Sequence, residues 1–216
     1  IIIMQGLDIA LDLIEEKLVA LNRTPIIGLG SGRTASRVLK ELGKRLNNKN
    51  IRPVGVPTSA QIKLEVLDYY LISEPNFSFL DLVIDGADQV SSYNGYIIKG
   101  GGGALTKERI VWELSKERHV FVSQDKVVEK LVYPLPVEFI PFSYFLVKDS
   151  LIRLGLKPSL RVDSRGYPFI TENGNYIFDA SYSENSDLKS AYEEIIRIPG
   201  VLDAGLFIYD INLHVI

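Results

Sequence analysis

The chain has 216 residues, of which 46% are hydrophobic and 24% charged, and its formal net charge is −3. These values predict a globular protein with one substantial core and a smaller second one, and they argue against nucleic acid or an anionic membrane as a partner. The sequence contains no cysteine, which excludes disulfides, thiolate metal ligands and thiol nucleophiles, so we expect a reducing, cytoplasmic location.

The first half of the sequence alternates apolar segments with amphipathic ones. The apolar opening, residues 1–4, is too short for a signal peptide and is predicted to merge into a helix marked by Leu7, Leu11, Ile14, Leu18 and Leu21. Further helices are predicted over 35–46, 60–70 and 105–116, and strands over 25–29, 51–56, 80–84, 96–98 and 119–122. Because these strands lack polar alternation and most are separated by helices, the pattern predicts an α/β fold with a Rossmann-like, mostly parallel sheet and helices on both faces.

The pattern changes after Tyr133-Pro-Leu-Pro136. The following elements are a strand near 137–142, a helix over 145–154, strands at 160–162 and 167–171, an Asn173-Gly174 hairpin turn with a strand after it, a helix over 188–196 and a strand at 205–209. This β-α-β-β-α-β order predicts a ferredoxin-like α+β subdomain. We therefore predict a catalytic domain of residues 1–133 and 210–216 and a subdomain of residues 134–209.

Polar and glycine residues follow several predicted strands. In parallel α/β sheets, ligands bind beyond the carboxyl ends of the strands. We expect one crevice to be lined by the residues just past those ends, which are Gly30, Thr58, Asp85, Lys99 and Gln124.

Four consecutive glycines, Gly100 to Gly103, lie between Lys99 and a helix that carries Glu108 in its first turn. Glycine allows the backbone to turn several N–H groups toward one anion. A cation, amide donors and a carboxylate together suit the stabilisation of an oxyanion while a proton is moved. The alternative is that Glu108 only complements the helix dipole, which is the commoner role of such a residue.

The loop Gly28-Leu-Gly-Ser-Gly-Arg-Thr34 leads from a strand into a helix, where free N–H groups favour an anion. Its alternative is a tight turn capped by Thr34. A dinucleotide site is excluded because the next strand ends without an acidic residue, and a nucleotide P-loop is excluded because no Gly-Lys-Ser/Thr ending is present.

Asp85 and Asp88 follow a buried strand and can converge on one polyol, whereas the alternative is a simple Asp-Gly turn. Lys126 follows another strand and is either a phosphate ligand or a solvated loop lysine.

The remaining polar and aromatic candidates favour structural roles. His119 and His214 stand singly in apolar strands, so we expect no metal site. Trp112, Tyr69 and Tyr70 are interpreted as core or interface residues.

Together these segments resemble the A-type ribose-5-phosphate isomerases over about residues 26–207. The resemblance rests on the loop ending at Thr34 and on Gly55-Val-Pro-Thr-Ser59, Asp85-Gly-Ala-Asp88, Lys99-Gly-Gly-Gly-Gly-Ala-Leu105, Leu135-Pro-Val-Glu-Phe-Ile-Pro141, Thr171-Glu-Asn-Gly-Asn175 and Ile198-Pro-Gly-Val201. It implies interconversion of ribose 5-phosphate and ribulose 5-phosphate through an enediolate, in the non-oxidative pentose phosphate pathway. It also implies that the enzyme needs no metal or organic cofactor and assembles as a homodimer or homotetramer.

The resemblance also implies site residues. Glu108 matches the base that moves a proton between C1 and C2, Asp85 and Asp88 match the pair that handles hydroxyls and ring opening, and Lys99 matches the cation beside the oxyanion. Substrate binding is implied for these two aspartates and Lys99 and for Ser31, Gly32, Arg33, Thr34, Gly86, Ala87, Gly100, Gly101, Gly102 and Lys126.

The chain departs from the family pattern at a few positions. Ser31 and Arg33 replace threonine and serine, Gln89 replaces a glutamate, and no lysine precedes Lys17. We hypothesise that Arg33 compensates for a missing basic contact to phosphate. Two functions of other classes are alternatives: a non-catalytic sugar-phosphate sensor, which would not need Glu108, and an acyl-CoA transferase, for which the chain is short.

Overall fold

The computed structural model describes residues 2–216, with the side chains of residues 6–216. The chain forms two compact units. The first unit consists of the residues up to Ala87 together with Lys107–Lys126 and Asp210–Ile216. The second unit consists of Asp88–Thr106 and Val127–Tyr209. The domain boundary at residue 133 stays a prediction.

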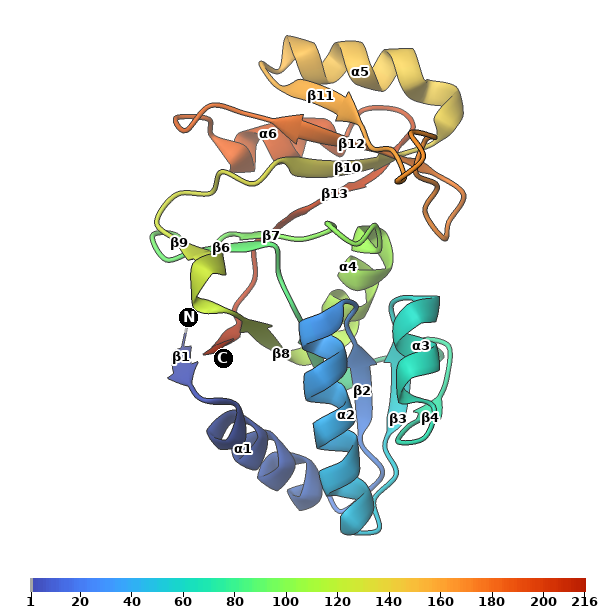
Figure 1. The fold of residues 1–216 in the computed structure, drawn as a ribbon, viewed down its shortest axis with the longest axis vertical. Coiled ribbons are helices and arrows are strands. Elements are labelled where there is room, and N and C mark those ends of the chain that lie inside the picture. The colour runs from blue at the N-terminus through green and yellow to red at the C-terminus, as the bar shows by residue number, and fades with distance from the viewer. Residues whose placement is uncertain (1) are drawn as a thin grey trace. The chain divides into compact units, whose positions relative to one another are not determined.

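The first unit contains a parallel sheet with strand order β1-β15-β8-β5-β2-β3-β4. Figure 1 labels β1, β8, β2, β3 and β4 of this sheet. Every neighbouring pair is parallel, as predicted. The strands are β1 (Ile2–Gln5), β2 (Ile26–Leu29), β3 (Val54–Pro57), β4 (Leu71–Ile72), β5 (Leu80–Asp85), β8 (Ser115–Val122) and β15 (Asn212–Val215).

The prediction that the apolar opening joins the first helix is wrong. Residues 2–5 form β1, and α1 (Leu7–Ala20) begins only after Gly6, whose φ is 100°. β-Branched isoleucines favour extended backbone, and a glycine at positive φ interrupts a helix, so the two elements separate at Gly6.

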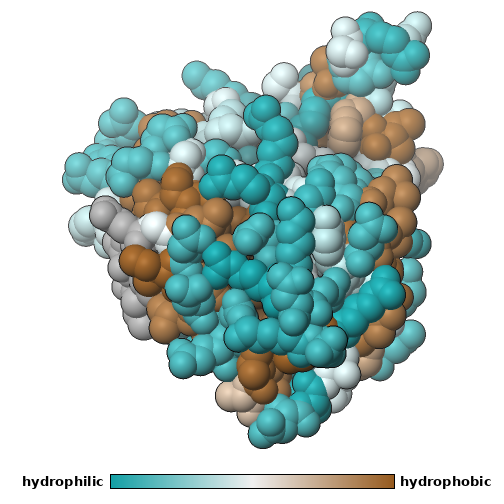
Figure 2. Space-filling model, turned by 60° about the horizontal axis from the view of Figure 1, so that its bottom comes forward, coloured by the Kyte–Doolittle hydropathy of each residue, from teal (hydrophilic) through white to brown (hydrophobic). Residues whose placement is uncertain are grey.

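Helices cover both faces of this sheet. α1, α2 (Arg33–Asn48) and α3 (Ala60–Val66) bury apolar side chains against one face, where Ile27 and Leu29 of β2 point. Gly28 points to the other face, toward α4 (Leu105–Leu114): a Cβ on Gly28 would lie 2.4 Å from Val111 Cγ1. The surface turned toward the viewer in Figure 2 is mostly hydrophilic, with smaller hydrophobic areas. No helix within residues 2–216 is long and apolar enough to cross a bilayer.

The second unit contains an antiparallel sheet with strand order β11-β12-β10-β13. Its elements follow in the predicted β-α-β-β-α-β order: β10 (Leu135–Phe139), α5 (Tyr144–Arg153), β11 (Lys157–Leu160), β12 (Tyr176–Ser181), α6 (Leu188–Ile195) and β13 (Val201–Ala204). A separate apolar core includes Val137, Phe139, Val147, Phe178 and Ile195. The ferredoxin-like subdomain is therefore confirmed.

Two predicted strands of this unit are wrong. Residues 167–171 make only an isolated antiparallel bridge, between Val162 and Pro168, which is flanked by hydrogen bonds from the Phe169 N–H to the Arg161 carbonyl at 2.9 Å and from the Asp163 N–H to the Tyr167 carbonyl at 2.7 Å. The closing segment 205–209 is not the fourth strand of the sheet. β13 takes that place, and β14 (Leu206–Phe207) pairs with β7 (Ile97–Ile98) instead.

A third sheet has the order β14-β7-β6-β9, with β6 at Gln89–Ser91 and β9 at Val127–Val128. β7 pairs antiparallel with β6 and β14, so the prediction that this segment belongs to the main sheet is wrong. A short apolar run carries no information about which sheet it joins. Lys99 therefore does not follow a strand of the parallel sheet. The other predicted crevice residues do stand at the carboxyl ends of strands of that sheet, namely β2, β3, β5 and β8.

Candidate active site

Hydroxyl groups connect the loops that follow β2 and β3. The Gly30 N–H donates to the Ile84 carbonyl at 2.8 Å. Ser31 Oγ lies 2.7 Å from Thr58 Oγ1 and donates to Ser59 Oγ at 2.7 Å. Thr58 is buried, and its hydroxyl donates to the Leu29 carbonyl at 2.9 Å. These bonds fix the first loop at the carboxyl end of the parallel sheet.

The first turn of α2 lies beside a cavity of about 260 Å³ in the first unit. The cavity is lined by Arg33, Thr34, Arg37, Ser123 and Ile216. The N-cap of α2 is Gly32, with no capping side chain, so the alternative that Thr34 caps this helix is wrong. Two guanidinium groups beside a helix N-terminus favour an anion by charge and by backbone N–H donation.

Asp85 is fully buried at the end of β5. Its Oδ2 accepts a hydrogen bond from Trp112 Nε1 at 2.8 Å, and its Oδ1 accepts one from the Gly86 N–H at 2.8 Å. A Cβ on Gly30 would lie 2.2 Å from Asp85 Oδ1, so a glycine is required where the carboxylate approaches the loop. The sequence predicts only a core or interface role for Trp112, and the structure shows that its indole N–H also binds a predicted site residue.

Glu108 lies on α4, one helical turn before Trp112, and is 5% exposed. Residues four apart share one face of a helix. The predicted base is therefore on the buried face of α4, together with the tryptophan that holds Asp85.

Lys126 lies beside the turn that follows β5. Its Nζ donates to the Ala87 carbonyl at 2.8 Å, and the residue is partly buried. The alternative of a merely solvated lysine is therefore wrong. Lys126 is the last residue of a short 3₁₀ turn, Gln124–Lys126, after β8, and its ammonium group reaches the segment that begins with Asp85.

Asp88 and the glycine loop contact each other in the second unit. The Gly101 N–H donates to Asp88 Oδ2 at 2.7 Å, and a Cβ on Gly101 would lie 2.4 Å from Asp88 Oδ1. Lys99, at the start of the loop, is 3% exposed, with Nζ 5.8 Å from the Phe207 ring centroid. Its N–H donates to the Gly205 carbonyl at 2.9 Å. The second unit thus brings together a carboxylate, a buried ammonium group and the glycine backbone.

Gln89, the neutral residue after the aspartate pair, has a structural role. Its Oε1 accepts hydrogen bonds from the Val132 N–H at 2.9 Å and the Tyr133 N–H at 2.8 Å. Burial, and then the negative charge of Asp88, raise the pKa of Tyr133. An amide oxygen is a sufficient acceptor for these two donors, which accounts for the neutral residue at this position.

Glu138 is a buried carboxylate that the sequence analysis did not single out. Its Oε1 accepts hydrogen bonds from the side chains of Thr171 at 2.7 Å, Asn173 at 3.0 Å and Asn175 at 3.0 Å. Its Oε2 accepts one from the hydroxyl of Thr106, two residues before the predicted base. The motif of residues 135–141 thus contacts the motif of residues 171–175. A contact between residues more than thirty positions apart cannot be predicted from a single sequence.

The two histidines form a buried pair between β8 and β15. His119 Nδ1 lies 2.9 Å from His214 Nε2, and His119 Nε2 lies 3.3 Å from Glu117 Oε2. Burial lowers the pKa of both imidazoles, that of His214 to about 4. Among the residues the structure describes, no three histidine, aspartate or glutamate side chains are grouped to hold a metal ion.

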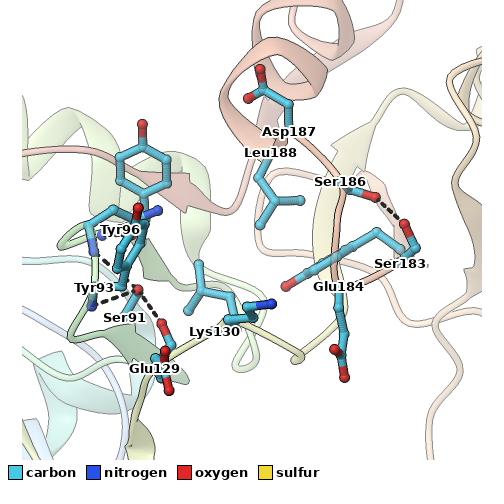
Figure 3. A pocket seen from close by; sticks show the side chains of 13 residues that line it. Ser91, Tyr93, Tyr96, Glu129, Lys130, Ser183, Glu184, Ser186, Asp187 and Leu188 are labelled. Atoms are coloured by element: carbon cyan, nitrogen blue, oxygen red, sulfur yellow. Dashed lines mark hydrogen bonds between the residues drawn. The ribbon is translucent and has the colours of Figure 1, made fainter.

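Another cavity, of about 300 Å³, lies within the second unit and contains none of the predicted site residues. Figure 3 shows Lys130 and Leu188 between the turn at Ser91 and the segment from Ser183 to Asp187. Ser91 Oγ donates to the Glu129 carbonyl at 2.8 Å, and Asp187 caps α6. These polar groups serve local structure.

Comparison with known proteins identifies the relatives of this chain. Residues 54–216 match the family model described as ribose 5-phosphate isomerase A (phosphoriboisomerase A). The chain is 36% identical over 205 residues to ribose-5-phosphate isomerase A of Methanococcus aeolicus, covering 93% of this chain and 87% of the relative.

Solved structures of the same name are also similar. Ribose 5-phosphate isomerase A from Methanocaldococcus jannaschii has a TM-score of 0.82 and 35% identity, covering 93% of this chain and 90% of that one. A D-ribose-5-phosphate isomerase in complex with phospho-erythronic acid has a TM-score of 0.80 and 34% identity, covering 94% and 91%.

Proposed function

This chain belongs to the ribose 5-phosphate isomerase A family and is an aldose–ketose isomerase, and from that premise we propose how its residues interconvert D-ribose 5-phosphate and D-ribulose 5-phosphate. The sensor and acyl-CoA transferase alternatives are not retained, because the relatives and solved structures compared above are isomerases. The substrate is a sugar phosphate, in keeping with the phospho-erythronic acid bound to a similar structure.

Glu108 is the proposed base. The reaction removes the C2 proton of the open-chain aldose and returns a proton to C1, so one carboxylate that reaches both carbons is sufficient. The observation that carries this assignment is the burial of Glu108 on the same face of α4 as Trp112, which holds Asp85.

Lys99 and the glycine loop are proposed to stabilise the oxyanion of the enediolate. A buried ammonium group is a strong electrostatic partner for a developing negative charge. Asp85 and Asp88 are proposed to handle the sugar hydroxyls and ring opening. Each is held by an N–H of the adjoining loop, which fixes the orientation of its carboxylate.

The phosphate is proposed to bind the Ser31–Thr34 loop and Lys126. The cavity at the start of α2 supports this assignment, because the positively charged side chains of Arg33 and Arg37 line it. Gly32, Gly86 and Ala87, together with Gly100, Gly101 and Gly102, are proposed to contribute backbone contacts. Gly101 N–H already donates to Asp88, so within this set its proposed role is to orient that carboxylate.

We further propose that the enzyme is a cytoplasmic homodimer or homotetramer that uses no metal or organic cofactor. The assembly rests on the family resemblance, and the location rests on the lack of cysteine. Size-exclusion chromatography with light scattering tests the assembly, and activity after chelation tests the independence from metal.

The assay is the formation of ketopentose phosphate from ribose 5-phosphate by the purified chain. Glu108→Gln is expected to lower kcat at least ~100-fold while substrate still binds. The matched control is Glu113→Gln, an exposed glutamate on the same helix, which is expected to keep wild-type turnover. Absence of turnover in the wild type contradicts the isomerase function, and unchanged turnover in Glu108→Gln contradicts only the assignment of the base.

A further inference from the structure

Arg161 holds two consecutive carbonyl groups of the glycine loop. It follows β11 in the second unit, and its side chain is 13% exposed. Its Nη1 donates to the Gly100 carbonyl at 2.8 Å and to the Gly101 carbonyl at 3.1 Å. Its Nε, at 2.9 Å, and its Nη2 donate to the two carboxylate oxygens of Asp179. One guanidinium therefore connects an acidic side chain of β12 to the loop backbone.

These contacts determine where the loop N–H groups point. The structure has no cis peptide bonds within the residues described, and in a trans peptide the carbonyl and the N–H point in opposite directions. In the first peptide, the Gly100 carbonyl accepts from Arg161 and the Gly101 N–H donates to Asp88 Oδ2 at 2.7 Å. In the next peptide, the Gly101 carbonyl accepts from the same nitrogen, so the Gly102 N–H is directed away from Arg161.

Two further observations separate this arrangement from an ordinary surface ion pair. Gly102 is exposed, and an added Cβ there would meet no atom within 4 Å, so there is open space beside its Cα. Arg161 is itself fixed: Asp179 binds one edge of the guanidinium, and the Phe169 ring centroid lies 5.8 Å from Arg161 Cζ. Phe169 also contacts the loop, since a Cβ on Gly103 would lie 2.5 Å from Phe169 Cε1.

The chemistry requires arginine rather than lysine. A planar guanidinium binds a carboxylate through two parallel hydrogen bonds and retains donors for other acceptors. A lysine ammonium is a point charge without this fork, so it cannot keep both the two-point contact to Asp179 and the two carbonyl contacts.

We propose that Arg161 is a positioning residue for the isomerase reaction: it fixes the Gly100–Gly102 backbone so that Asp88 and the Gly102 N–H are presented together to the oxygens of the sugar. This inference rests on the proposed function for the identity of the ligand, but the arrangement of the loop is independent of it. Arg161 does not touch the substrate and acts through two peptide groups.

The test compares Arg161→Ala and Arg161→Lys with Arg165→Ala. Arg165 is the matched control because it lies four residues away and its side chain is 76% exposed, in an ion pair with Asp163 at 3.2 Å. The measurements are hydrogen exchange of the peptide that covers residues 99–104, the Kd of phospho-erythronic acid, kcat and KM for ribose 5-phosphate, inhibition by inorganic phosphate, and rescue by guanidinium ion.

Arg161→Ala is expected to accelerate exchange in the loop, to weaken phospho-erythronic acid at least about tenfold and to lower kcat roughly 30- to 100-fold. Inhibition by inorganic phosphate should change less than about twofold, because the phosphate contacts are assigned to other residues. Guanidinium ion at sub-denaturing concentration should restore part of the activity of Arg161→Ala and none to Glu108→Gln. Arg165→Ala should match the wild type in every measurement.

The proposal is overturned if exchange in the loop and phospho-erythronic acid binding stay at wild-type levels in the Arg161 variants. It is also overturned if the effects equal those of Arg165→Ala. Should Arg161→Ala fail to fold, Arg161→Lys decides by the same criteria, because it keeps the charge and loses the fork. If the wild type shows no turnover but exchange and binding respond as expected, the proposed reaction fails and the positioning role of Arg161 stands.

Discussion

The buried histidine pair predicts a specific loss of stability in mild acid. The hydrogen bonds are consistent with one arrangement of protons: His119 Nε2 donates to Glu117, and His214 Nε2 donates to His119 Nδ1. His214 Nδ1 is then an acceptor, and it has no hydrogen-bonding partner among the side chains and backbone of residues 6–216. Protonation of His214 would place a charge and an extra N–H at a fully buried site, where Nδ1 faces no acceptor among residues 6–216.

The magnitude follows from proton linkage. The pKa of His214 is lowered from its ordinary 6.5 to about 4 in the folded chain, chiefly by burial and then by the charge that His119 acquires when protonated. Between these values the unfolded chain binds more protons than the folded one. Stability is therefore complete above about pH 6.5 and falls as the pH is lowered toward 4, by about 2 kcal/mol between pH 7 and pH 5.

Urea-induced unfolding of the wild type and of His214→Phe at about pH 7 and pH 5 measures this loss. The chain has only two histidines, so few other groups titrate in that range. Phenylalanine keeps an aromatic ring beside Phe121, whose centroid lies 4.4 Å from that of His214. The variant should lose about 2 kcal/mol less than the wild type between the two pH values. An equal loss in both proteins would refute the reasoning.

Three further predictions concern the residues around Asp85. Lys126→Met should raise KM about tenfold with a smaller change in kcat, as expected for a phosphate contact, and an unchanged KM in steady-state assays would argue against that role. Gly30→Ala should destabilise the fold by about 1–3 kcal/mol, because its Cβ would lie 2.2 Å from the Asp85 carboxylate. Gly86→Ala is the control in thermal melting, since its Cβ would approach no atom outside its immediate chain neighbours closer than 3.8 Å; equal melting shifts would contradict the steric argument. Trp112→Phe should cost about 1–3 kcal/mol of unfolding free energy by removing a buried donor from Asp85, and a variant as stable as the wild type would show that this bond is dispensable.

The sequence was a good guide to elements whose pattern is long and regular. The parallel strands and amphipathic helices of the first unit follow from apolar periodicity, and the subdomain follows from the order of its elements. For short apolar segments, the sequence does not determine which sheet or element they join. The run ending at Ile98 forms β7 in a separate sheet, and the apolar opening became β1, because pairing partners distant in the sequence decide such cases.

The same distinction applies to the candidate site. Residues in contiguous motifs, such as Asp85, Asp88 and the glycine run, could be proposed because their chemistry is local. Trp112, Glu138 and Arg161 contact residues that are distant in the sequence, and no regular spacing in the sequence predicts these contacts. Glu138 and Asn175 stand in two separate sequence motifs, and only the structure shows that one binds the other.

The central claim is that the Glu108 carboxylate carries hydrogen between C2 and C1 of the sugar phosphate. The most direct measurement follows ribose 5-phosphate deuterated at C2 by NMR, in wild-type protein and in Glu108→Gln. The account predicts that the wild type moves deuterium to C1 or loses it to water as ketose forms, and that Glu108→Gln does neither at a measurable rate while still binding phospho-erythronic acid. Deuterium loss at the wild-type rate in Glu108→Gln would contradict it.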